Sequence, residues 1–344
     1  MKVLVFLLLT AGVGTTAVPT PRVGVERTTM MKETSVPASL AGSVVTGTYD
    51  GPEGRRPYRL YVPRGYDATK ALTMLVMLHG CTQDAADIAR GTQFDAEAEA
   101  GDFLLLYPEQ TVAANPGRCW NWFDAAHQLR GGGEPAILAA MIAHVGAAYH
   151  ADPRRVHLAG VSAGAAMAGL LAVAYPERFA SLTAASGVGW RAATDVTRAI
   201  AVMRQGAGEA LPPGSVMRTA MGTNAWSLPV FVIHGGKDAV VSVSNGEELA
   251  RQFSELQDIL RREMGQSVLV ETDIPVRVQQ GYTVRERQWR DAEGQAAVTL
   301  LRVEELGHAW SGGSPSGTFT DRSGPNASQL IAAFIAQHTR PAVR

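Results

Sequence analysis

The chain has 344 residues, with 31 lysines and arginines against 32 aspartates and glutamates, and its net charge is −1. This near balance argues against nucleic acid or an anionic membrane as a partner. The apolar fraction of 46% is enough for a buried core, and beyond the N-terminus no apolar run is long enough to span a membrane. We find no internal repeat and expect one large domain.

The first 17 residues have the pattern of a signal peptide. Lys2 gives a positive start, residues 3–9 are apolar, and small residues lead up to Ala17. The alternative is a membrane anchor, but the run is too short to span a bilayer. We therefore expect cleavage after Ala17 and export to the extracellular space or the periplasm. Residues 18–41 mix Pro, Thr, Ser and Val without a period, which indicates a flexible leader before a catalytic domain at 42–344.

From residue 42 onward, strand and helix patterns follow one another. Residues 43–49 and 58–62 alternate around a turn cluster and predict an antiparallel hairpin. Short apolar runs predict further strands, and 3.6-residue spacing predicts helices. These further strands are expected over 72–78, 103–107, 155–161, 180–185, 228–233, 283–289 and 297–303, and the helices over 92–100, 134–150, from 163, 245–264 and 323–337. Alternating strands and helices imply an α/β fold with a mostly parallel sheet and helices on both faces.

A G-x-S-x-G sequence around Ser162 separates a predicted strand from an Ala-rich helix. In that context the motif predicts a sharp turn that lifts the serine Oγ to a helix N-terminus, while its glycines relieve crowding. The alternative is an ordinary turn between a strand and a helix. A serine hydroxyl attacks well only when a base takes its proton, so the chain should also supply a histidine and a carboxylate.

Asp238 and His308 each lie in a loop just after a predicted strand, as Ser162 does. Chemistry in parallel sheets gathers at the carboxyl ends of the strands, and the order Ser, Asp, His is that of α/β-hydrolases. We predict that His308 takes the proton of Ser162 and that Asp238 orients the imidazole. The other seven histidines are assigned to helices, a strand interior or structural positions.

Cys81 and Cys119 are the only cysteines. In an exported protein such a pair favours a disulfide, with two free buried thiols or a reactive cysteine as alternatives. The sequence before Cys81, His79-Gly80, follows an early strand and suits an oxyanion loop, because Gly lets backbone N–H groups turn toward a substrate oxygen. No histidine pair accompanies the cysteines, so we predict neither a metal nor a cofactor.

Several tryptophans lie in loops beside or after these predicted elements. Packing in the core is the alternative for each, but together they predict an apolar substrate cleft. The residues concerned are Trp120, Trp122, Trp190 and Trp310. Residues 191–227 lack strand character and are interrupted by Gly and Pro, which indicates a small insertion over the active site.

Five motifs, in this order along the chain, resemble the esterase, polyhydroxybutyrate (PHB) depolymerase family of α/β-hydrolases. Feruloyl and acetylxylan esterases of carbohydrate esterase family 1 are close to that family. The motifs are LHGCTQ at 78–83, CWNWF at 119–123, GVSAGAAM at 160–167, HGGKD at 234–238 and GHAWSGG at 307–313. The resemblance extends over about residues 42–340. It implies a Ser162, Asp238 and His308 triad, a Cys81–Cys119 bridge, and oxyanion donors at the backbone N–H groups of Cys81 and Ala163.

The resemblance further implies a secreted serine esterase that hydrolyses hydroxyalkanoate or other short-chain carboxylic esters through an acyl-enzyme. We expect a monomer. The related expectation is a feruloyl or acetylxylan esterase acting on plant polysaccharide esters. If the chain is not an enzyme, the alternative is a catalytically silent binding protein on a hydrolase scaffold. Depolymerases that attack solid polymer usually carry a separate polymer-binding domain after the catalytic one. None follows His308 in this sequence, so we expect faster hydrolysis of soluble oligomers than of crystalline polymer.

Overall fold

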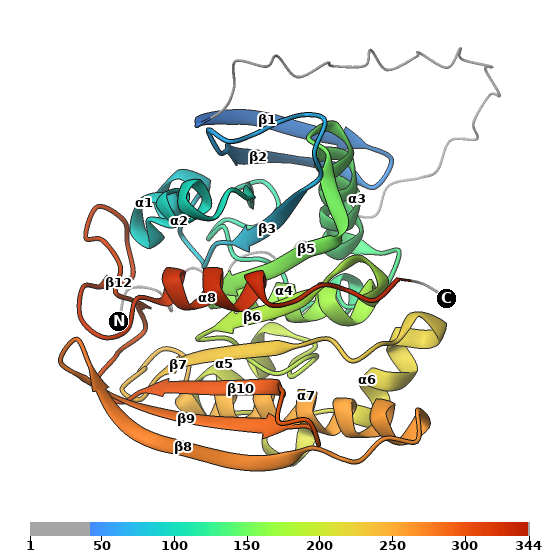
Figure 1. The fold of residues 1–344 in the computed structure, drawn as a ribbon, viewed down its shortest axis with the longest axis vertical. Coiled ribbons are helices and arrows are strands. Elements are labelled where there is room, and N and C mark those ends of the chain that lie inside the picture. Colours follow the sequence, from blue (N-terminus) through green and yellow to red (C-terminus); the bar gives the residue numbers. More distant parts are fainter. Residues whose placement is uncertain (1–41, 343–344) are drawn as a thin grey trace, which may run out of the picture.

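The computed structural model describes residues 42–342, so the expected signal peptide at 1–17 and leader at 18–41 lie outside it. Its centre is a ten-stranded sheet with the order β1-β2-β4-β3-β5-β6-β7-β10-β9-β8 (Figure 1). The strands are β1 (Ser43–Gly51), β2 (Gly54–Val62), β3 (Leu72–Leu78), β4 (Leu104–Pro108), β5 (Ala151–Val161), β6 (Ser181–Ala185), β7 (Val230–Gly235), β8 (Val270–Gln279), β9 (Tyr282–Arg290) and β10 (Ala296–Val303).

The middle of the sheet is parallel and its two sides are antiparallel. Strands β4, β3, β5, β6, β7 and β10 run the same way, whereas the β1–β2 and β8–β9 hairpins pair antiparallel to their neighbours. The parallel strands place the loops after β5, β7 and β10 at one edge of the sheet. A second, small sheet pairs β11 (Trp310–Ser311) with β12 (Thr320–Asp321) beside that edge.

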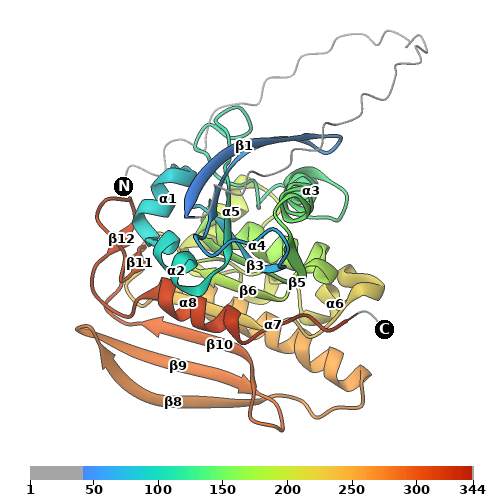
Figure 2. The same cartoon turned by 45° about the horizontal axis from the view of Figure 1, so that its top comes forward.

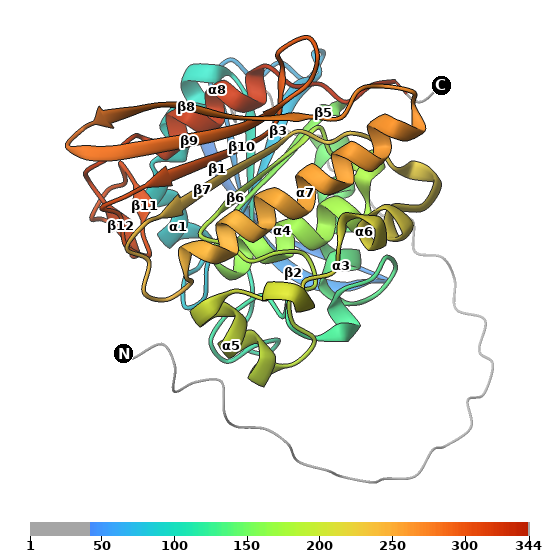
Figure 3. The same ribbon diagram turned by 90° about the horizontal axis from the view of Figure 1, so that it is seen from below.

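Helices cover both faces of the large sheet (Figures 2 and 3). One face carries α1 (Ala85–Thr92), α2 (Phe94–Gly101) and α8 (Ala327–Ala336). The other face carries α3 (Gly133–Ala148), α4 (Ala163–Ala174), α6 (Gly214–Met221) and α7 (Val243–Glu263), with α5 (Val196–Gln205) packed against α7. No helix within residues 42–342 is both long and apolar enough to cross a membrane.

The side chains of β3 show how one strand serves two cores. Met74, Val76 and Leu78 point into the core under α3, α4 and α7, while Leu75 and Met77 point into the core under α1, α2 and α8. Successive residues of a strand face opposite sides, so a strand covered on both faces must be apolar throughout. This explains the unbroken apolar run at 74–78. The mostly parallel sheet with helices on both faces agrees with the predicted α/β fold.

The sequence prediction missed several elements, among them α1 and β8. α1 has only eight residues, and it begins where the Asp84 side chain accepts a hydrogen bond from the N–H of Asp87. β8 was missed because it is an edge strand with little buried surface, so the usual apolar alternation is weak. The segment at 191–227, expected to lack strands and to form an insertion, contains the helices α5 and α6 and no strand.

β8 ends the sheet on one side and is irregular. Its pairing with β9 shifts register between Ile274 and Arg277, around Pro275, which has no N–H to donate. Val270, Val276 and Val278 are exposed along it. The outer edge of the sheet is therefore interrupted in its middle.

Candidate active site

Ser162 lies at the sharp turn between β5 and α4. Its backbone φ is 57°, in the left-handed region that residues other than glycine seldom adopt. Such strain costs on the order of 1–3 kcal/mol and persists only where the surroundings hold it. Here the Ser162 N–H donates to the carbonyl of Ala185 on β6, and the Ser162 carbonyl accepts from Ala165 and Ala166 at the start of α4.

Two glycines make this turn sterically possible. A Cβ at Gly160 would lie 2.3 Å from the carbonyl oxygen of Gly164, and one at Gly164 would lie 2.2 Å from the carbonyl oxygen of Leu78. Neither contact is tolerable with a side chain. The G-x-S-x-G spacing therefore reflects the close crossing of α4 over β5 and β3 at the point where Ser162 is displayed.

The structure brings Ser162, His308 and Asp238 together in one hydrogen-bonded chain. His308 Nε2 lies 3.1 Å from Ser162 Oγ, and His308 Nδ1 lies 2.7 Å from Asp238 Oδ2. Each residue follows the carboxyl end of a parallel strand, β5, β10 and β7 respectively. Burial raises the pKa of the Asp238 carboxyl, but the hydrogen bonds from His308 and the Val241 N–H outweigh it and hold that pKa below its ordinary value.

His234 packs against the loop that carries Asp238, residues 236–242, and holds it in place. It is fully buried, its Nε2–H donates to the Val241 carbonyl at 2.9 Å, and the same nitrogen lies 3.5 Å from Asp238 Oδ2. Gly246 of α7 rests directly on the ring, since a Cβ there would lie 2.5 Å from His234 Nδ1. Burial lowers the pKa of His234, so the ring stays neutral beside the aspartate.

The loop after β3 reaches the other side of Ser162. Cys81 is joined to Cys119 by a disulfide with an S–S distance of 2.02 Å, which confirms the expected bridge. A Cβ at Gly80 would lie 3.4 Å from Ser162 Cβ, so this loop packs against the serine. Within residues 42–342 the N–H groups of Cys81 and Ala163 donate to no carbonyl or side chain. Ala163 is also the first residue of α4, where N–H groups have no partner in the helix and the helix dipole is positive.

A small hollow of about 30 Å³ opens beside Ser162. It contains expected residues, namely Cys81, Ser162 and His308. Its other lining residues are Gly80, Gln83, Val161, Met203, Val240 and Phe319. Gln83 and Val240 lie within two residues of expected site residues and could have been found from them. Met203 comes from α5, within the segment 191–227 that was expected over the active site. Phe319 comes from the loop between β11 and β12, and the sequence carries no signal that places it here.

The four tryptophans expected in the cleft lie elsewhere, and this corrects the prediction. Trp120, Trp122, Trp190 and Trp310 are all at most 5% exposed, and none lines the hollow beside Ser162. Trp310 alone lines an adjoining hollow of about 10 Å³, next to Phe319. The indoles instead pack in the core, where Trp120 Nε1 donates to the His79 carbonyl and Trp310 Nε1 donates to Ser328 Oγ. Large aromatic groups gain more from such burial than from lining a shallow site.

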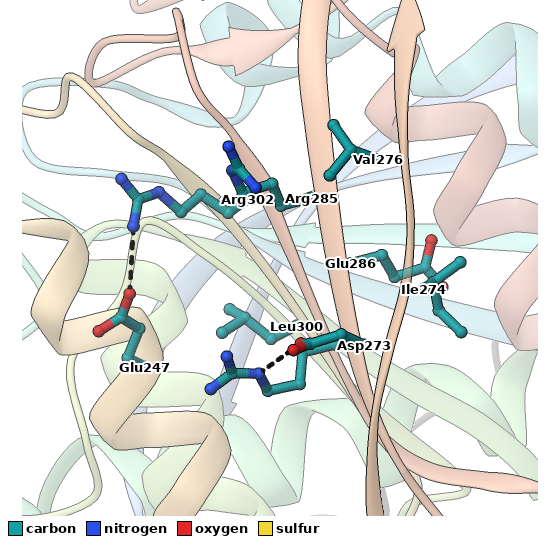
Figure 4. Close-up of a pocket in the computed structure, with 9 residues that line it drawn as sticks. Glu247, Asp273, Ile274, Val276, Arg285, Glu286, Leu300 and Arg302 are labelled. Carbon is teal, nitrogen blue, oxygen red and sulfur yellow. Dashed lines mark hydrogen bonds and ion pairs between the residues drawn. The ribbon is translucent and has the colours of Figure 1, made fainter.

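A second hollow, of about 210 Å³, lies where β8, β9 and β10 face α7 (Figure 4). Its arginines already have carboxylate partners. Arg302 pairs with Glu247 and with Glu304, Arg287 pairs with Asp273, and Arg285 pairs with Glu304. No group of three or more potential metal ligands occurs within the described residues.

The fold and the hydrogen-bonded Ser, His and Asp side chains are those of an α/β-hydrolase. A family model described as "Esterase PHB depolymerase" matches residues 56–271. The chain belongs to this esterase, PHB depolymerase family.

Two curated relatives and one solved structure illustrate the likeness. Over 201 residues the chain is 32% identical to poly(3-hydroxyalkanoate) depolymerase C of Paucimonas lemoignei, covering 58% of this chain and 48% of that protein. Over 152 residues it is 34% identical to acetylxylan esterase A of Talaromyces purpureogenus, covering 43% of this chain and 38% of that protein. The matches thus span less than half the length of these relatives. An acetyl xylan esterase from Aspergillus awamori shares the fold with a TM-score of 0.61 at 21% identity, over 78% of this chain and 94% of that one.

Proposed function

We propose that the chain is a serine esterase that hydrolyses short-chain carboxylic esters, with hydroxyalkanoate oligomers as its main substrates. The observation that carries this proposal is the hydrogen-bonded chain from Ser162 Oγ through His308 to Asp238. The family to which the chain belongs supports the same chemistry.

The reaction begins with attack of Ser162 Oγ on the ester carbonyl carbon, while His308 Nε2 accepts the hydroxyl proton. Asp238, held as a carboxylate, stabilises the imidazolium that forms. The tetrahedral intermediate then expels the alcohol, which takes the proton from His308, and an acyl-serine remains. Water, deprotonated by His308, attacks this acyl group and releases the acid, and the proton returns to Ser162.

We assign the oxyanion donors to the backbone N–H groups of Cys81 and Ala163. Both flank Ser162, and both are without a partner in the part of the chain that the structure describes. Preorganised donors of this kind act where negative charge develops, and losing one costs about 10²- to 10³-fold in rate. The disulfide between Cys81 and Cys119 keeps the first donor in place.

The size of the hollow supports a small acyl group. About 30 Å³ holds two or three water-sized groups, since one needs roughly 10–15 Å³. A short acyl group such as acetyl therefore fits this hollow better than a long fatty chain. Acetylated xylan stays a second candidate because an acetyl group meets the same limit and because a curated relative is named for it.

A fluorophosphonate probe tests the chemistry directly. The wild-type protein should be labelled at Ser162 and should hydrolyse p-nitrophenyl acetate and hydroxybutyrate oligomers. Ser162→Ala should abolish both, whereas Ser267→Ala, which changes an exposed serine beyond α7, should alter neither. An unlabelled wild-type protein without ester turnover would favour a binding protein on this scaffold. A panel that includes acetylated xylan and methyl ferulate ranks the substrate classes.

We also propose that the protein is exported. The disulfide supports this, because disulfides persist mainly in oxidising compartments. Secreted protein recovered from its host should begin at Val18 and carry the Cys81–Cys119 bridge. Recovery only as an unprocessed chain in the cytoplasm would contradict export.

A further inference from the structure

In the peptide that links Gly80 to Cys81 the carbonyl is held by two hydrogen bonds, and the N–H of the preceding peptide, at Gly80, is held as well. The Gly80 N–H donates to Gln83 Oε1 at 2.9 Å. The Gly80 carbonyl is bound by His79 Nδ1 at 2.7 Å and by the Gln83 N–H at 3.3 Å. The Cys81 N–H is left without a partner among residues 42–342.

The tautomer of His79 follows from its second contact. The backbone N–H of Gln110 lies 3.0 Å from His79 Nε2. A backbone amide can only donate, so Nε2 must carry the lone pair and the proton must be on Nδ1. His79 is fully buried, and burial lowers its pKa to about 4, so the ring is neutral at neutral pH. His79 Nδ1–H is thus the donor to the Gly80 carbonyl.

The planarity of the peptide links the direction of the Gly80 carbonyl to the direction of the Cys81 N–H. In a planar trans peptide the C=O and the following N–H point in opposite directions. Because His79 holds the Gly80 carbonyl on the buried side, the Cys81 N–H is turned to the other side. Cys81 and Ser162 both line the hollow beside the serine.

The residues around His79 fix the ring in turn. Trp120 Nε1 donates to the His79 carbonyl at 3.1 Å, and the two ring centres are 5.4 Å apart. Trp120 adjoins Cys119, which is bonded to Cys81. The motifs at 78–83 and 119–123 therefore contact each other on both sides of the Gly80–Cys81 peptide, through Trp120 and through the disulfide.

We propose that His79 is a positioning residue, whose Nδ1–H fixes the plane of the Gly80–Cys81 peptide and so aims the Cys81 N–H at the oxyanion. This inference rests on the proposed esterase function. His79 touches neither substrate nor Ser162, and it acts only through the peptide that it binds.

Two isosteric substitutions separate this role from a purely structural one. In His79→Asn the amide nitrogen takes the place of Nδ1 and keeps the donor to Gly80, but nothing accepts from Gln110. In His79→Gln the longer amide keeps an acceptor near Nε2 for Gln110, but the donor to Gly80 is lost. Each variant loses one buried hydrogen bond, so their losses of thermal stability should be similar.

Their kinetics should differ. We expect kcat of His79→Gln on p-nitrophenyl acetate to fall about 10- to 100-fold with KM nearly unchanged, because the oxyanion contact strengthens only in the transition state. His79→Asn should keep kcat within a few-fold of wild type. Phenylboronic acid, which forms a tetrahedral adduct on the serine, should bind His79→Gln at least tenfold more weakly than His79→Asn.

Other outcomes would overturn the inference. Equal kcat losses in the two variants, following their melting temperatures, would show that His79 only stabilises the fold. Unchanged kcat and boronate affinity in His79→Gln would show that the peptide holds its orientation without the ring. Both outcomes leave the esterase proposal intact, whereas a wild-type protein that neither reacts with fluorophosphonate nor hydrolyses ester would overturn both.

Discussion

Asp238 divides its two carboxylate oxygens between His308 and its own loop. Oδ2 lies 2.7 Å from His308 Nδ1, while Oδ1 accepts the N–H groups of Val240 and Val241 at 2.9 and 2.8 Å. The loop amides fix the plane of the carboxylate, so its orientation toward His308 exists before any substrate binds. Preorganisation of this kind avoids reorganisation during the reaction.

Asp238→Asn should therefore remove most of the activity while leaving the fold in place. The side-chain oxygen can still accept from the loop, but an amide facing His308 Nδ1 favours the wrong tautomer. We expect a fall in kcat on the order of 10⁴-fold. Steady-state kinetics on p-nitrophenyl acetate measures it, with Glu305→Gln as a control that changes a carboxylate hydrogen-bonded to Thr283. A loss of less than tenfold would remove Asp238 from the triad.

Reduction of the Cys81–Cys119 bridge should cost both stability and rate. The bridge closes a loop with a sequence separation of 38, and losing it should lower the free energy of unfolding by about 2–5 kcal/mol. Because Cys81 also carries a proposed oxyanion donor, kcat should fall even where the reduced protein stays folded. Urea unfolding and ester turnover, each with and without reductant, test the two effects separately. An unfolding midpoint that reductant leaves unchanged would contradict the first.

Stability should fall as the pH drops below about 6.5. Burial lowers the pKa of His79 to about 4 and that of His157 to about 3, whereas both are ordinary histidines in the unfolded chain. At pH values between the lowered pKa of each folded histidine and the ordinary pKa of about 6.5, the unfolded chain binds protons that the folded chain does not. The free energy of unfolding should thus fall by about 1.4 kcal/mol per pH unit for each histidine.

Above pH 6.5 these two histidines contribute no pH dependence, because both states are neutral there. Urea unfolding at pH 7.5, 6.0 and 5.0 measures the slope. His157→Asn keeps a donor near Ser181, which His157 Nδ1 contacts at 2.8 Å, and should reduce the slope by removing one titrating group. Equal stability at all three pH values would be incompatible with neutral, buried rings.

Phe319 should limit the length of the acyl group. It lines both the hollow beside Ser162 and the smaller one beside Trp310, as Gln83 and Val161 do, so its side chain forms part of the boundary between them. Two hydrogen bonds hold the backbone here. The Phe319 carbonyl accepts from the Trp310 N–H, and the N–H of the preceding residue, Thr318, donates to the Asp87 carboxylate. Removing the ring should therefore join the hollows without moving the loop.

We expect Phe319→Ala to raise kcat/KM for p-nitrophenyl octanoate relative to the acetate by about tenfold or more, since contacts of one or two methylenes are worth roughly that much. Leu129→Ala, which alters an exposed apolar residue lining neither hollow, serves as the control. An unchanged octanoate to acetate ratio would place the acyl group elsewhere.

The sequence predicted well what local chemistry dictates and less well what depends on distant contacts. Ser162, Asp238 and His308 could be found because each follows a strand and bears a reactive group. The segment that contains Met203 was expected over the active site, but its helix and the contact of that one side chain were not. Phe319 could not be found, because nothing local shows that the loop before β12 reaches Ser162. The prediction that the four tryptophans line the cleft failed for a related reason. A loop position in the sequence does not reveal that the indole packs into the core. His79 carried a visible motif, but its ring contacts depend on Gln110, 31 residues further along.

The irregular strand at the edge of the sheet bears on how the folded protein behaves at high concentration. Regular edge strands offer a row of free N–H and C=O groups onto which a strand of another molecule can add, the first step toward fibrous aggregates. In β8 the proline and the register shift interrupt the row of free backbone groups in its middle, where exposed valines would otherwise favour association with another molecule. The last strand of this sheet is thus a poor template for growth from one molecule to the next.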